Sequence, residues 1–287
     1  MLPARRTARQ PSRPGVLSPT GRTRLALVTL TCAVALLVSI AAVIAWLAPT
    51  AFGDRPATCV ETRCFCEAVG SGLLRQPANA LSSLAFCVSA VWAAMRGRRL
   101  PPRSPELRLT PALVCTLVAL GAGSLAYHGQ LTFAGQLLDI QGMYVLGTLL
   151  VVGALWRRGT IDAKRASASA AVVLVTLAGL QWLLPDARRW LFAIVLIPGI
   201  VLERSLAPRS APLRAAVLTL LLGYAAWLVD DRGWWCDPQS WAQGHALWHL
   251  LTALSAGLVV EHYGRTAHSA GRWSAPCPPD DRTPPAW

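Results

Sequence analysis

Three of the five histidines in this 287-residue chain have the spacing and setting of metal ligands. His245 and His249 are four positions apart, so on a helix they would share one face, with Cβ atoms about 5–6 Å apart. Both imidazoles could then reach the same ion, as in other helical zinc sites. Such a pair is weak on its own, because two polar rings on one face are more often packing residues. A metal site therefore needs a ligand from elsewhere in the chain, and His128 is the candidate.

Two residues near His128 could take part in catalysis at such an ion. Ser124 lies one helical turn before His128 and would share its face. Asp139 stands in an apolar run, where an ionisable side chain is costly and by default marks a functional site or a paired charge. Each residue also has an alternative interpretation. Ser124 could allow close helix packing as part of Gly121–Ser124, and Asp139 could cap a helix at the membrane interface.

The elements that position these residues are predicted to be membrane-spanning helices. The chain is 54% hydrophobic and 14% charged, whereas soluble domains average about 25% charged residues. Runs of about 20 apolar residues are long enough to cross a bilayer, and hydrogen bonding in hydrocarbon then requires helices. We expect an all-α, polytopic bundle with spans at 25–48, 77–96, 107–128, 134–156, 167–184, 189–206, 212–229 and 243–262.

The distribution of charge predicts how these helices are oriented. The net charge of +13 comes from arginine clusters between the apolar runs rather than on one face, so we expect no nucleic-acid partner. Basic residues precede the first run and follow the second, fourth and sixth, which places both termini in the cytoplasm; Arg188 and Arg189 depart from this alternation. Ser124, His128, Asp139 and the histidine pair then share one layer near the outer face of a bacterial-type plasma membrane.

The composition of the chain ends and of the first apolar run predicts their structure. We expect a basic disordered tail at 1–24, a retained helix at 25–48 rather than a cleaved signal peptide, a helical core at 60–265 and a disordered tail at 266–287.

The remaining histidines and the cysteines are expected to lie outside the site. His262 and His268, at or beyond the end of the last run, should be solvated. Cysteines in apolar runs should be small core residues: Cys32, Cys87 and Cys115. If the loops face an oxidising compartment, one or two disulfides would form among the loop cysteines, with the pairing left open: Cys59, Cys64, Cys66 and Cys236.

The order Ser-x-x-x-His, Asp and His-x-x-x-His resembles the CREST superfamily of membrane hydrolases. Cys66-Glu67 followed by Gln76–Ser83 is similar to the segment before the first core helix in its alkaline ceramidase family. The resemblance covers about 60–265 and implies a seven-helix core, with 25–48 as an extra N-terminal helix. It implies that zinc is bound by His128, His245 and His249, that Asp139 orients or deprotonates the attacking water, and that Ser124 stabilises the oxyanion.

The same resemblance bears on calcium. Relatives in the ceramidase branch hold calcium just before the first core helix, and Glu67 and nearby Asn79 would be a remnant of that site. The other acidic positions of the family are Cys64, Val69 and Gln76 here, which argues against a complete calcium site.

The predicted function is that of a zinc-dependent intramembrane hydrolase, which cleaves the amide bond of ceramide or a related N-acyl lipid taken from the membrane. Two alternatives are an ester-cleaving lipid remodelling hydrolase and a receptor or binding protein with structural zinc. A transporter is disfavoured, because only three spans carry the polar layer and the halves show no inverted repeat. The sequence names neither the substrate nor the oligomeric state.

Overall fold

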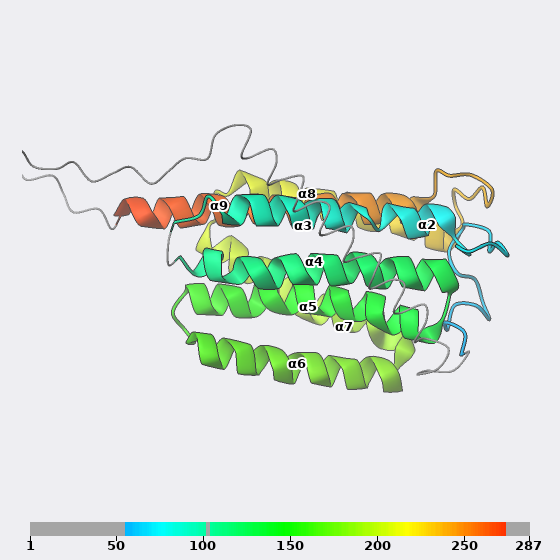
Figure 1. The fold of residues 1–287 in the computed structure, drawn as a ribbon, viewed down its shortest axis with the longest axis horizontal. Helices are drawn as coiled ribbons and strands as arrows, with labels where there is room; N and C mark the ends of the chain where they lie inside the picture. Colours follow the sequence, from blue (N-terminus) through cyan, green and yellow to red (C-terminus); the bar gives the residue numbers. More distant parts are fainter. Residues whose placement is uncertain (1–54, 102–103, 274–287) are drawn as a thin grey trace, which may run out of the picture.

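The computed structural model describes residues 55–101 and 104–273, with side chains as far as 268, and this part of the chain is a bundle of helices (Figure 1). Five helical segments are long and apolar enough to cross a membrane: Pro77–Gly97, Pro105–Gln130, Phe133–Arg157, Ala163–Leu183 and Ala211–Arg232. The predicted all-α membrane bundle is therefore confirmed. The predicted tail at 1–24 and helix at 25–48 lie outside the described residues.

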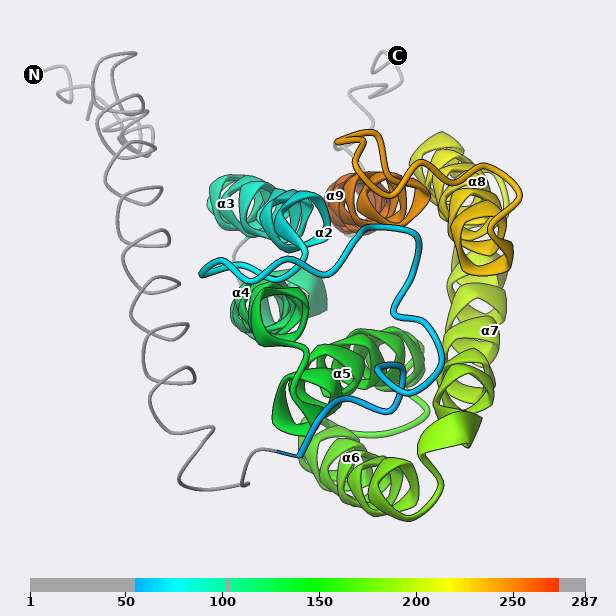
Figure 2. The ribbon, with the colours of Figure 1, turned by 90° about the vertical axis from the view of Figure 1, so that its right-hand side faces the viewer.

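The helices follow the predicted runs closely. They are α2 (Pro77–Ser82), α3 (Ala85–Gly97), α4 (Pro105–Gln130), α5 (Phe133–Arg157), α6 (Ala163–Leu183), the 3-10 helix η1 (Pro185–Ala187), α7 (Arg188–Leu206), α8 (Ala211–Arg232) and α9 (Gly244–Trp273). With α2 and α3 counted as one interrupted helix, the described residues form the seven-helix core. Figure 2 shows α9 flanked by α3 and α8, while α4 and α5 lie in the next layer and α6 at the edge.

Local signals in the sequence explain where the helices begin. Ser104, Thr132, Asp162 and Ser210 precede α4, α5, α6 and α8, and the side chain of each accepts a hydrogen bond from a backbone N–H in the first turn. Such caps supply partners for N–H groups that have none within the helix. Leu131, with φ of 53°, ends α4 directly before the cap of α5. This two-residue connection brings the ends of α4 and α5 together.

Glycines let α4 and α5 pack closely beside this connection. A Cβ atom at Gly123 would lie 2.9 Å from the backbone of Leu138, and one at Gly135 would lie 2.8 Å from the Cα of Tyr127. Only the absence of a side chain allows this approach. The close contact holds the end of α4, with Ser124 and His128, against the start of α5, with Asp139.

A buried ionic network joins the helices at the opposite end of the bundle. The carboxylate of Glu203 is fully buried and contacts the guanidinium of Arg157, Nε2 of His262 (3.1 Å) and the hydroxyl of Tyr263 (2.9 Å). Arg157 also lies 3.5 Å from the carboxylate of Glu106. The network connects α4, α5, α7 and α9, so it fixes their arrangement far from the three candidate ligands.

The expectation that His262 is solvated was wrong, because this side chain is 0% exposed. Nδ1 of His262 lies 2.9 Å from the hydroxyl of Ser210, and its other nitrogen faces Glu203. The last helix also continues to Trp273, so 266–273 is helical where the sequence suggested the start of a disordered tail. Thr266 reaches Glu106, and Ala267 is buried, which explains why the helix persists beyond the apolar run.

Two disulfides connect the loop cysteines, Cys59 with Cys64 and Cys66 with Cys236. Cys87 is buried as expected, but Cys115 is exposed, which corrects the prediction that it is a core residue. An apolar run that crosses a membrane has an outward face of apolar residues, so membership of the run does not place a residue inside. Cys32 lies outside the described residues.

Candidate metal centre

Three buried histidines meet at one end of the bundle. His128 lies in the last turn of α4, while His245 and His249 lie in the first two turns of α9; the three are 0%, 5% and 3% exposed. Nε2 of His128 is 3.1 Å from Nε2 of His245, and one nitrogen from each of the three rings lies within 4.8 Å of the others. In the part of the chain that the structure describes, no other set of three or more histidine, cysteine or carboxylate side chains converges in this way.

Gln76 determines which nitrogen of His128 faces the other two rings. Its amide nitrogen donates to the backbone oxygens of Cys64 and Glu67, the latter at 3.0 Å. The amide oxygen therefore faces Nδ1 of His128 at 3.1 Å. This oxygen can only accept a hydrogen bond, so Nδ1 carries the proton and Nε2 presents its lone pair.

The same logic applies to His249 with a different partner. Its Nδ1 donates to the backbone oxygen of Asn79 at 3.0 Å and lies 2.8 Å from the hydroxyl of Ser82. Its Nε2 is directed toward the interior of the site, 3.2 Å from the hydroxyl of Ser124. In the neutral form, in which histidine binds metals, both rings therefore present Nε2 to the interior of the site.

These residues fit a bound metal ion. Nε2 of His128 and Nε2 of His245 lie 3.1 Å apart, and Nδ1 of His245 has no hydrogen-bond partner among the described residues. A tetrahedral ion with metal–nitrogen distances of about 2.0–2.1 Å would hold pairs of ligand atoms about 3.3 Å apart. Three imidazoles also leave one position of such an ion open, which is the pattern of catalytic rather than structural zinc sites.

Ser124 and Asp139 lie beside the three rings. Ser124 is fully buried on α4, and Asp139 is 8% exposed on α5. The hydroxyl of Ser124 lies 3.2 Å from Nε2 of His249, and a Cβ atom at the neighbouring Gly123 would lie 3.0 Å from the backbone nitrogen of Asp139. Gly123 therefore makes the close contact with α5, while the next residue, Ser124, contacts His249. The layer predicted from topology brings together a hydroxyl, a carboxylate and three imidazoles.

The model of the Ceramidase family matches residues 65–270 of this chain. The chain belongs to the ceramidase family. The match contains the three histidines, Ser124 and Asp139, and it confirms the resemblance seen in the sequence. No curated protein matches the chain.

In this ceramidase-family protein, Glu67 caps a helix. Its two carboxylate oxygens accept hydrogen bonds from the backbone N–H groups of Ala78 (2.6 Å) and Asn79 (2.9 Å), which are the free donors at the start of α2. The pKa of Glu67 is raised, mainly by burial and to a smaller extent by the nearby charge of Asp230. The two hydrogen bonds from the backbone oppose this rise in the pKa. The side-chain amide of Asn79 is buried without a hydrogen-bond partner among the described residues.

Three residues near the site cannot be predicted from the sequence. Gln76 stands at a position that is acidic in the family, and its contact with His128 orients that ring. Phe65 stacks on His245 with ring centroids 3.7 Å apart, and Asp230 accepts a hydrogen bond from the backbone of His245. Each contact joins residues distant in sequence, and no motif in the sequence indicates them.

Proposed function

We propose that this protein is a zinc-dependent hydrolase that cleaves the amide bond of ceramide or of a related N-acyl lipid. The observation that carries the proposal is the convergence of three buried imidazoles beside Ser124 and Asp139, which are buried as well. Membership of the ceramidase family supports the amide bond of a lipid as the target.

The histidines would hold the metal, and two other side chains would act on the reacting atoms. Zinc bound by His128, His245 and His249 would supply a Lewis acid and lower the pKa of a water molecule from about 16 to about 7. Asp139 would accept the proton that this water loses as its oxygen bonds to the carbonyl carbon of the lipid amide. The same proton is then available to the nitrogen that leaves when the C–N bond breaks.

Ser124 would stabilise the charge that develops on the carbonyl oxygen. Its hydroxyl is fully buried and lies 3.2 Å from Nε2 of His249, so it is held in place before the substrate binds. A donor fixed at the position of a developing oxyanion typically contributes about 10²–10³ in rate. The serine would therefore act as a hydrogen-bond donor and not as a nucleophile.

The lipid would reach this site from the membrane, with its head group at the outer face. The alternation of basic loops supports cytoplasmic termini, which puts the metal end of the bundle outside. The two disulfides lie in the loops at this end, and disulfides persist in oxidising compartments. In this orientation the acyl chains would stay among the helices while the amide meets the metal.

The proposal can be tested by the release of fatty acid from ceramides and other N-acyl lipids by purified protein supplied with zinc. We expect His249→Ala to abolish the release. His268→Ala is the matched control, because His268 lies on the same helix with an exposed side chain. Full activity of His249→Ala would contradict the proposal, and faster cleavage of matched ester lipids would favour an ester hydrolase.

A further inference from the structure

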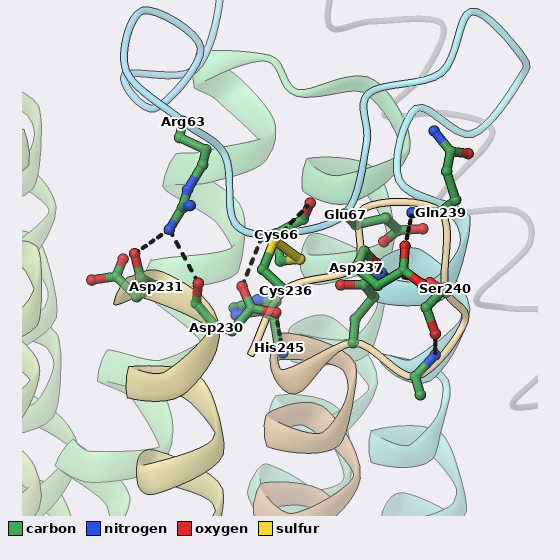
Figure 3. The surroundings of a disulfide bond; sticks show 12 residues. Arg63, Cys66, Glu67, Asp230, Asp231, Cys236, Asp237, Gln239, Ser240 and His245 are labelled. Carbon is green, nitrogen blue, oxygen red and sulfur yellow. Dashed lines mark hydrogen bonds between the residues drawn. A yellow bond between two sulfur atoms is a disulfide. The ribbon is translucent and has the colours of Figure 1, made fainter. Parts of the chain in front are cut away.

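Asp230 lies where three parts of the chain meet at the metal end of the bundle (Figure 3). It is fully buried near the C-terminal end of α8. One carboxylate oxygen accepts a hydrogen bond from the backbone N–H of Cys66 at 2.9 Å, and the other accepts from the backbone N–H of His245 at 3.0 Å. A single carboxylate thus joins α8 to the segment before α2 and to the first turn of α9.

His245 is held differently from the other two histidines of the site. Nδ1 of His128 and Nδ1 of His249 each face an oxygen, but Nδ1 of His245 has no hydrogen-bond partner among the residues that the structure describes. The ring of His245 instead stacks on Phe65 with an interplanar angle of 27°. Its position therefore depends on its own backbone and on the placement of Phe65.

The carboxylate of Asp230 holds both the backbone of His245 and the segment that carries Phe65. The N–H of His245 belongs to the first turn of α9, where backbone donors lack partners within the helix and a negative charge is favourable. The N–H of Cys66 directly follows Phe65, whose φ of 67° is unusual for a bulky side chain. The hydrogen bond to Asp230 and the disulfide to Cys236 hold this part of the chain in place.

We propose that Asp230 is a positioning residue of the metal centre, which fixes His245 and the aromatic ring stacked on it without contacting the ion. The inference rests on the proposed function only in treating the three histidines as metal ligands. It differs from a general structural role, because it assigns to Asp230 an effect on the affinity and geometry of the bound metal in the folded protein.

The test is the affinity of the full chain for zinc, measured by competition with a chelator, together with the absorption spectrum of the cobalt-substituted protein. In Asp230→Asn one accepting oxygen becomes an NH₂ group, which cannot accept from a backbone N–H. We expect zinc affinity to fall about tenfold or more and the cobalt spectrum to change, as for other residues that support metal ligands. Asp231→Asn is the matched control, because Asp231 pairs with Arg189 at 3.0 Å and should leave both readouts unchanged.

Phe65→Leu provides a second variant that leaves Asp230 intact, in case Asp230→Asn does not fold. It removes the stacked ring and should also lower zinc affinity and alter the cobalt spectrum. The inference would be overturned if folded Asp230→Asn had the zinc affinity and cobalt spectrum of the wild type. If only Phe65→Leu folds, the same result in that variant would overturn it. A wild type that binds zinc but hydrolyses no lipid would contradict the proposed function alone, and the affinities would still decide on Asp230. A wild type that binds no zinc would overturn both.

Discussion

The amide oxygen of Gln76 lies 3.1 Å from Nδ1 of His128, while the amide nitrogen of the same side chain donates to two backbone oxygens in the 64–67 segment. The loop before the first core helix and a candidate metal ligand on α4 are therefore connected through one fully buried side chain. This relationship makes the loop part of the candidate metal centre.

Replacement of Gln76 by leucine should weaken metal binding. Without the amide oxygen, Nδ1 of His128 has no acceptor and its ring is no longer oriented, so we expect zinc affinity to fall about 10–100-fold. Competition with a chelator would measure the change. Gln239→Leu is the control, because Gln239 is exposed in the loop before α9. An unchanged affinity in folded Gln76→Leu would contradict the role assigned to this contact.

Ser124→Ala should separate catalysis from metal binding. The variant keeps all three histidines, so zinc content should stay at the wild-type level. We expect kcat for amide hydrolysis to fall about 10²–10³-fold, because one donor to the oxyanion is lost. Ser89→Ala, which removes a buried hydroxyl bonded to α9 away from the ligands, should retain activity. A near-normal kcat in Ser124→Ala would exclude the oxyanion role.

Glu203→Ala should destabilise the bundle strongly without removing a candidate ligand. The substitution leaves Arg157, with a side chain only 5% exposed, without its main partner, and breaking a buried pair typically costs about 3–5 kcal/mol. Thermal unfolding of the metal-free protein in detergent would record the loss. Glu261→Ala breaks the more exposed pair with Arg96 and should cost at most about 1 kcal/mol. An equal loss of stability in the two variants would show that the buried network contributes no more to stability than the exposed pair does.

Loss of the Cys66–Cys236 disulfide should destabilise the protein more than loss of the Cys59–Cys64 disulfide. The first joins residues 170 positions apart and the second only 5, and the stabilisation by chain entropy is about 5 and about 2 kcal/mol respectively. Serine pairs at each disulfide, compared by thermal unfolding, would measure the difference. The opposite order would mean that the long connection does not restrict the unfolded chain.

Much of the fold could be predicted from the sequence, because it depends on apolar run length. The runs at 107–128 and 134–156 match α4 and α5 to within a few residues. The run at 77–96 did not reveal that the helix is interrupted after Ser82, since the length of an apolar run does not locate a break within it. The run length also gives a position along the helix axis but no direction around it, which is why the burial of His262 and the exposure of Cys115 were missed.

The grouping of the three histidines at one end of the bundle could be predicted, because topology alone assigns the ends of helices to the same layer. The roles of Gln76 and Asp230 could not. Gln76 reaches His128 across 52 positions, and Asp230 reaches Cys66 across 164, so both contacts exist only after the helices have packed. Neither residue type is unusual in its local sequence.

The most direct test of the metal centre is the zinc content of the purified wild type and of His128→Ala, His245→Ala and His249→Ala. Three imidazoles around one ion predict about one zinc per chain in the wild type and a large loss in each variant. A variant that keeps a full equivalent of zinc at wild-type affinity would show that the three rings do not share an ion.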